Sequence, residues 1–192
     1  MTRDIPDHDL FTYSFPCQDI SIAGNVKGLD KGSGTRSSLL WECEKVIKTK
    51  RPKYLLLENV KNLVGSKNME NFEKWLYILH GHGYRSFYQV LNAKDYGVPQ
   101  NRERVFVVSV LDKDLDYKFP AKRGTSKILK DILEPEVAEN YYFSNEKLKT
   151  LKFRQEPGSE LKHIADLEIS NRQDLNRVYD PSGIAPTLNT MQ

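Results

Sequence analysis

The stretch Tyr54-Leu55-Leu56-Leu57-Glu58-Asn59 is the strongest indication of fold class in this 192-residue chain. Its first four residues are continuously apolar, which is typical of a strand buried on both faces of a sheet. Upstream, apolar residues at helical spacing predict a helix that Pro52 ends; they are Leu39, Cys43, Val46 and Ile47. Cys43 lies on that stripe and is expected to be a core residue. Glu58 ends the apolar run and is a candidate site residue.

Further elements surround this strand and its helix. Leu10–Phe15 is predicted to be a strand, and the glycine-rich segment 18–35 a long functional loop. A second helix has Phe72, Trp75, Leu76 and Leu79 on one stripe, and the strands Phe87–Leu91 and Val105–Leu111 follow it. This order predicts a doubly wound α/β sheet. Ligands bind beyond the carboxyl ends of strands in such sheets, and Cys17 and Glu58 both follow predicted strands.

The amino-acid composition favours a folded chain and argues against membrane proteins and metal-binding proteins. Hydrophobic residues make up 39% of the chain, enough for a core, and the net charge is +3 with a pI near 8.7. No apolar run approaches the roughly 20 residues of a membrane span. The two cysteines form no CxxC pair, which favours a reducing cytoplasm, and the four histidines lack metal-ligand spacing. We therefore expect neither membrane nor metal.

After Leu111 the periodic pattern ends. Basic residues are frequent there, either as a solvated surface or as a nucleic-acid contact; they are Lys118, Lys122, Arg123, Lys127, Lys130, Lys147, Lys149, Lys152 and Arg154. Residues 180–183 (Asp-Pro-Ser-Gly) predict a turn, and residues 184–190 predict a strand-like piece with nothing to pair against. The sequence thus predicts two parts, residues 1–112 and 113–192.

Three groups could form one reactive site. Cys17 is a nucleophile, Glu58 an acid, and the cluster at residues 100–104 (Gln-Asn-Arg-Glu-Arg) a cationic clamp. Together they suit attack on an electron-poor heteroaromatic ring. Plainer interpretations remain: a small buried cysteine, a glutamate that caps a loop, and arginines at a solvated strand entrance.

In their order and spacing, these residues resemble the DNA (cytosine-5) methyltransferase family. The matching blocks lie within the first 110 residues or so: Ile5–Asp9, Phe15–Gln18, Glu58–Val60, Asn92–Pro99 and Gln100–Arg104. The resemblance implies an S-adenosylmethionine-dependent methyltransferase fold of the Rossmann type, here partial. After it, the start of a smaller, irregular, β-containing target-recognition region is expected.

The resemblance implies a role for each catalytic residue. Cys17 would attack C6 of a cytosine, which makes C5 nucleophilic toward the methyl group of S-adenosylmethionine. An unperturbed thiol has a pKa of about 8.5, so cationic or polar neighbours that lower it favour the thiolate. Glu58 would protonate or hydrogen-bond N3 of the ring, Arg104 would hold the ring oxygen and orient Glu58, and Arg102 would be a second cation nearby.

The resemblance also implies binding residues. Pro16 and Leu39 match positions that line the cofactor pocket. Because an in-stack base cannot be approached, the target base must be flipped out of duplex DNA. The implied DNA contacts are Gln18, Ser21, Arg36, Arg177 and Thr187.

The sequence departs from the family at both ends. The family's Phe-x-Gly-x-Gly cofactor turn is absent upstream of Ile5, and the final blocks do not follow residue 192. The chain is therefore expected to be an internal section of a longer bacterial or phage enzyme, cytoplasmic, in a restriction-modification or phage setting. Two alternatives are one subunit of a split methyltransferase with a complementary partner, and an inactive remnant that binds DNA or a partner.

Overall fold

The computed structural model describes residues 4–16, 39–112, 114–154 and 160–187. The chain divides into two compact units. The first unit comprises residues 1–91 and 103–121, and the second comprises residues 92–102 and 122–192. The boundary that the sequence predicted, between a catalytic and a target-recognition domain at residue 112, stays a prediction.

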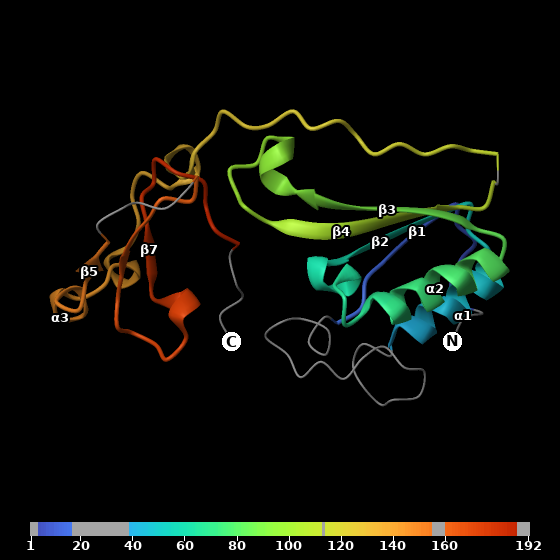
Figure 1. The fold of residues 1–192 in the computed structure, drawn as a ribbon, viewed down its shortest axis with the longest axis horizontal. Coiled ribbons are helices and arrows are strands. Elements are labelled where there is room, and N and C mark those ends of the chain that lie inside the picture. The colour runs from blue at the N-terminus through green and yellow to red at the C-terminus, as the bar shows by residue number, and fades with distance from the viewer. Residues whose placement is uncertain (1–3, 17–38, 113, 155–159, 188–192) are drawn as a thin grey trace. The chain divides into compact units, whose positions relative to one another are not determined.

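A four-stranded sheet with the order β1-β2-β4-β3 is the frame of the first unit (Figure 1). Its strands are β1 (Leu10–Tyr13), β2 (Tyr54–Val60), β3 (Arg85–Asn92) and β4 (Glu103–Val110). β1 runs parallel to β2, whereas β4 runs antiparallel to it. The four predicted strands are confirmed, and the α/β sheet is mixed rather than wholly parallel.

Helices α1 (Leu40–Lys50) and α2 (Met69–Gly81) pack on one face of this sheet (Figure 1). Trp41 of α1 meets Trp75 of α2 edge to face, with ring centroids 5.8 Å apart, and Phe72 of α2 meets Tyr88 of β3 at 5.0 Å. α1 ends where Arg51 adopts a left-handed conformation and donates its N–H to the Ile47 carbonyl. Both predicted helices are confirmed.

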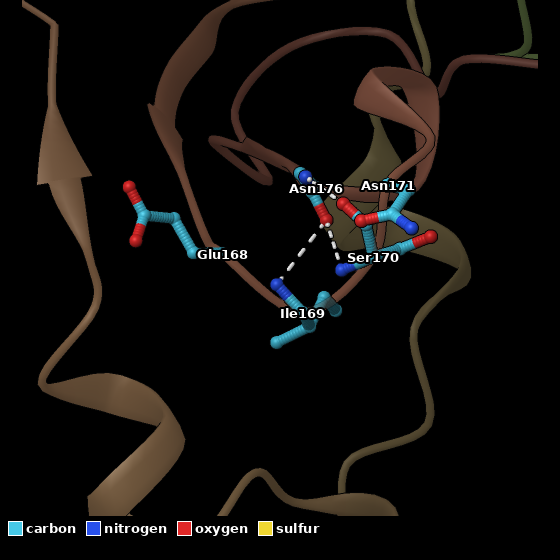
Figure 2. A pocket seen from close by; sticks show the side chains of 5 residues that line it. All are labelled: Glu168, Ile169, Ser170, Asn171 and Asn176. Carbon is cyan, nitrogen blue, oxygen red and sulfur yellow. Dashed lines mark hydrogen bonds between the residues drawn. The ribbon is translucent and has the colours of Figure 1, made fainter.

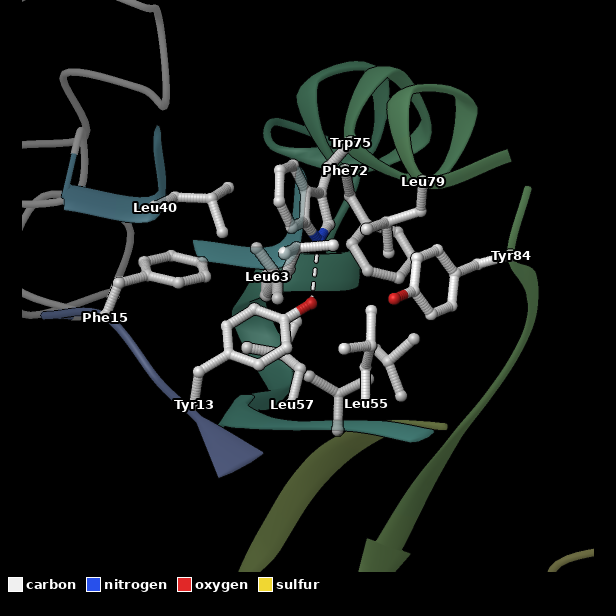
Figure 3. Packing of buried hydrophobic residues seen from close by; sticks show 13 residues of the cluster. Tyr13, Phe15, Leu40, Leu55, Leu57, Leu63, Phe72, Trp75, Leu79 and Tyr84 are labelled. Atoms are coloured by element: carbon white, nitrogen blue, oxygen red, sulfur yellow. Dashed lines mark hydrogen bonds between the residues drawn. The ribbon is translucent and has the colours of Figure 1, made fainter. Parts of the chain in front are cut away.

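The core lies between the sheet and these helices (Figure 3). Within it Trp75 Nε1 donates to the Tyr13 hydroxyl at 3.2 Å, which satisfies two buried polar groups. Burial along β2 alternates: Leu55 and Leu57 are buried, whereas Tyr54 is 43% exposed. The expectation that this strand is buried on both faces is wrong for the described residues, because both helices described above cover the same face.

The second unit contains the antiparallel sheet β5-β6-β7 and short helical turns. Its elements are η4 (Ala93–Tyr96), η5 (Leu129–Ile132), η6 (Glu139–Tyr141), α3 (Asn145–Leu148), β5 (Lys152–Phe153), β6 (His163–Asp166), η7 (Gln173–Leu175) and β7 (Arg177–Tyr179). The predicted turn is confirmed, since Gly183 N donates to the Asp180 carbonyl at 3.0 Å. In the described stretches, no helix is long and apolar enough to cross a bilayer.

The segment after that turn corrects one expectation from the sequence. Ala185 forms a parallel bridge with Gln100, although residues 184–190 were expected to have nothing to pair against. Ala185 N donates to the Pro99 carbonyl and Asn101 N donates to the Ala185 carbonyl, both at 2.8 Å. The partner is a loop that lies 85 positions earlier in the sequence.

Candidate active site

An ion pair between Glu58 and Arg104 forms the centre of the candidate site. Arg104 Nε lies 3.1 Å from Glu58 Oε1, and the side chains are 19% and 41% exposed, respectively. Glu58 is opposite Phe106 in the β2–β4 register, so Arg104 is its diagonal neighbour, within reach of a long side chain. Neighbouring Lys61 pairs with Glu103 at 3.0 Å. The predicted pairing of Arg104 with Glu58 is therefore present.

Glu58 lies inside β2, two positions before the strand ends at Val60, rather than beyond the strand end as the sequence indicated. Side chains alternate along a strand, so Glu58 lies on the face opposite the buried Leu57 and Asn59. That is the face not covered by α1 and α2. The carboxylate is consequently partly open to solvent, which a group that meets a substrate requires.

Two hydrogen bonds tie the segment after β1 to β2. Ser14 Oγ donates to the Glu58 carbonyl at 2.8 Å, and Asn59 Nδ2 donates to the Phe15 carbonyl at 3.1 Å. Asn59 is buried, and its Oδ1 accepts from Val60 N at 2.9 Å. Phe15 is also buried in the core (Figure 3). These contacts hold the backbone at Ser14 and Phe15, which lead to Cys17, against Glu58 and Asn59 of β2.

Several predicted residues lie outside the described part of the chain. They are Cys17, Gln18, Ser21 and Arg36. The two residues predicted to line a cofactor pocket are described: Pro16 is partly buried, and Leu39 precedes α1 with a side chain that is 50% exposed. Leu39 thus presents an apolar surface.

Arg102 belongs to the second unit, whereas Arg104 belongs to the first. Asn92 Oδ1 accepts from the Arg102 backbone N–H at 3.0 Å, and Asn92 Nδ2 donates to Asn101 Oδ1 at 2.7 Å. Sequence reasoning assigned no role to Asn92 or Ser14. An asparagine at the end of a strand is a common turn residue, which is the only signal the sequence offers for Asn92.

The two predicted DNA contacts of the second unit are both described. Arg177 is exposed at the start of β7. Thr187 Oγ1 donates to the Asn101 carbonyl at 2.6 Å. In this conformation the single hydroxyl hydrogen of Thr187 is used within the protein, so a phosphate, which only accepts, would have to displace that bond.

A polar hollow of about 610 Å³ lies in the second unit, lined by Glu168, Ile169, Ser170, Asn171 and Asn176 (Figure 2). Asn176 holds its wall, since Oδ1 accepts from Ser170 N at 2.9 Å and Nδ2 donates to the Ser170 carbonyl at 2.7 Å. None of the residues predicted from the sequence lines this hollow.

Cys43 lies apart from the candidate site. Cys43 is half-buried and packs against the core, and burial raises the pKa of its thiol. A thiol in that setting is a poor nucleophile, as expected for a structural cysteine. Over the residues that the structure describes, no group of three or more His, Cys, Asp or Glu side chains could hold a metal ion.

Known proteins of similar sequence and structure identify the family. The family model described as C-5 cytosine-specific DNA methylase matches residues 1–192. The type II methyltransferase M2.ScrFI of Lactococcus lactis subsp. cremoris is 54% identical over 143 residues, 74% of this chain and 40% of that protein. The orphan methyltransferase M.SssI of Spiroplasma monobiae is 38% identical over 190 residues, 97% of this chain and 49% of that protein.

Solved structures have the same fold. A putative DNA modification methyltransferase encoded within an E. coli prophage aligns with a TM-score of 0.57 and 18% identity, over 94% of this chain and 62% of that one. The DNMT2 structure of Spodoptera frugiperda aligns with a TM-score of 0.55 and 22% identity, over 75% of this chain and 46% of that one. The methyltransferase-type α/β fold that the sequence predicted is thus confirmed. The chain spans less than half the length of the two relatives compared above, and it belongs to the C-5 cytosine-specific DNA methylase family.

Proposed function

We propose that this chain carries the catalytic residues of a DNA (cytosine-5) methyltransferase. The observation that supports this most is the Glu58–Arg104 ion pair, on strands where two hydrogen bonds tie the backbone leading to Cys17. A carboxylate with a guanidinium beside it would supply the acid and the oxygen clamp that the reaction requires, and Cys17 would supply the nucleophile.

In the proposed mechanism the Cys17 thiolate adds to C6 of a flipped cytosine, which forms a carbon–sulfur bond and moves electron density toward C5 and N3. Glu58 donates a proton or hydrogen bond at N3, and Arg104 holds O2 while it keeps Glu58 oriented. C5 would then take the methyl group that S-adenosylmethionine supplies, as the bond between that methyl group and the cofactor sulfur breaks and S-adenosylhomocysteine leaves. Loss of the C5 proton to a base returns the electron pair and expels the Cys17 thiolate, which restores the aromatic ring.

S-adenosylmethionine is the proposed cofactor and supplies an electrophilic methyl group. Pro16 and Leu39 are the residues of this chain that we propose to contact it, through apolar surface. The proposed substrate is duplex DNA, with Gln18, Ser21, Arg36, Arg177 and Thr187 as its contacts, while Arg102 is proposed to act beside Arg104 as a second cation. The two named relatives are a type II and an orphan methyltransferase, and one similar structure is encoded within a prophage, which supports a restriction-modification or phage setting in a cytoplasm. A complementary subunit remains a prediction.

The test uses duplex DNA that contains 5-fluorocytosine, together with S-adenosylmethionine. Fluorine cannot leave as a proton does, so the covalent protein–DNA adduct accumulates and migrates as a shifted band. We expect an adduct with the unmodified protein and none with Cys17→Ala. Cys43→Ala is the matched control, because it removes the other cysteine, and it should retain the adduct. Stable DNA binding without any adduct would contradict the proposal and favour a binding remnant.

A further inference from the structure

The connection between β3 and β4 carries Arg102 and is long for a hairpin. Residues 93–102 separate the two strands, whereas hairpin loops usually have about two to five residues. A loop of this length does not hold one conformation through its own turn geometry. Further contacts are therefore needed to hold the whole loop, including the part far from its base, in one conformation.

The base of the loop is closed from within. Ala93 N donates to the Arg102 carbonyl at 3.0 Å, and Asn92 Oδ1 accepts from Arg102 N at 3.0 Å. Asn92 Oδ1 also accepts from Lys94 N at 3.3 Å, which caps the start of η4. These bonds join the two ends of the loop, and the Gly97 N–H donates to the Ala93 carbonyl at the end of η4, but the carbonyls of Asp95 and Tyr96, in the outer part of the loop, take no part in these bonds.

A segment of the second unit binds that outer part. The backbone N–H groups of Arg123 and Gly124 donate to the Asp95 carbonyl at 2.9 and 3.0 Å. The Arg123 guanidinium donates from both Nε and Nη2 to the Tyr96 carbonyl, at 3.1 and 2.8 Å. Lys122 Nζ pairs with Asp95 Oδ2 at 2.8 Å. We call Lys122–Gly124 together with Asp95–Gly97 the clasp.

The backbone of the loop is adapted to the clasp. Gly97 has a φ of +90°, a backbone conformation that residues other than glycine rarely adopt. A Cβ atom there would also come within 3.4 Å of Arg123 Nη2. The loop thus bends so that a guanidinium can lie against it, which is not expected of an arginine in a merely solvated basic run.

We propose that Arg123 is a positioning residue for the reaction. It fastens the outer part of the β3–β4 loop, so that Arg102 at the end of this loop is presented in one orientation; the proposal rests on the function proposed above. Arg123 does not itself contact the substrate. Because reaction rates fall steeply when a contributing group is displaced by about 1 Å, release of the clasp should slow chemistry more than it weakens DNA binding.

Hydrogen exchange of the whole protein tests whether the clasp holds the loop, and it needs no activity. In Arg123→Gln, the amides of residues 93–102 should exchange at least about tenfold faster than in the unmodified protein. Arg123→Lys keeps the charge but cannot place two donors on one carbonyl, so it should give an intermediate rate. Lys127→Gln removes a charge from the same segment and should leave the loop unchanged. An unchanged rate in Arg123→Gln overturns the proposal.

Single-turnover methyl transfer tests the link to chemistry. Arg123→Gln should lower the rate at saturating DNA by about tenfold or more, while the DNA dissociation constant stays within about twofold. Gly97→Ala, in which Arg123 is intact, should likewise lower the rate while the DNA dissociation constant stays nearly unchanged. Added methylguanidine should partly restore the rate of Arg123→Ala. A raised, salt-dependent dissociation constant with an unchanged rate would make Arg123 a DNA contact and overturn the positioning role. If the unmodified protein transfers no methyl group, the proposed function fails, whereas the exchange result still decides whether the clasp exists.

Discussion

At the scale of single residues, the proposed site depends on one carboxylate kept accessible and paired. Glu58→Gln keeps the size of the side chain but removes its acidity and its ion pair with Arg104. We expect methyl transfer to slow by about 10²–10⁴-fold, with DNA binding nearly unchanged. Glu103→Gln is the matched control, because it removes a carboxylate at the start of β4 that pairs with Lys61, the residue after β2. An equal loss of rate and of DNA affinity in Glu58→Gln would argue against the acid role.

Asn59 has a structural role beside that carboxylate. Asn59→Ala leaves the carbonyl of buried Phe15 without its donor, which should lower the free energy of unfolding by about 1–3 kcal/mol. Ser14→Ala removes an exposed bond to the Glu58 carbonyl and should lower it by less, about 0.5–1.5 kcal/mol. Urea unfolding of both variants gives the comparison. A larger decrease in the free energy of unfolding for Ser14→Ala than for Asn59→Ala would mean that burial does not determine how much each hydrogen bond contributes.

At the scale of elements, α2 follows directly from its sequence. Its apolar stripe predicted the buried face, and Phe72, Trp75 and Leu79 are all buried. Leu79→Ala should lower the free energy of unfolding by about 2–5 kcal/mol, because it opens a cavity in the core. Tyr77 lies on the same helix and is 78% exposed, so Tyr77→Ala should change it by less than about 0.5 kcal/mol. Similar urea midpoints for the two variants would contradict the packing described for α2.

Other elements could not be derived in this way. The bridge between Gln100 and Ala185 joins two short irregular segments, and neither has a periodic pattern that indicates its partner. Four apolar residues at Tyr54–Leu57 predict a strand, but they do not reveal whether a second layer covers it. The Glu58–Arg104 pairing was predicted because the family resemblance links the two residues; no such pattern exists for Ser14 or Arg123.

At the scale of the whole molecule, the first unit depends on a core with buried hydroxyl groups. Tyr13 and Tyr84 are both buried; the hydroxyl of Tyr13 accepts from Trp75 Nε1, and that of Tyr84 donates to the Pro52 carbonyl. Burial raises the pKa of both phenols above the usual value of about 10, because the charged form loses its hydration. This property connects the packing of single side chains to the pH range in which the fold is stable.

The sign of the pH effect follows from these raised pKa values. Below about pH 10 both tyrosines are neutral in the folded and unfolded states, and their full contribution to stability is present. As the pH rises above that value the unfolded chain loses protons first, so the free energy of unfolding falls. Tyr13→Phe should be less stable at pH 7, since Trp75 N–H loses its acceptor, yet its stability should fall less steeply from pH 9 to 11. Urea midpoints across this range measure the slope, with exposed Tyr77→Phe as the control that keeps the original slope. If Tyr13→Phe and Tyr77→Phe show the same slope, the phenol of Tyr13 is not shielded from ionisation in the native fold.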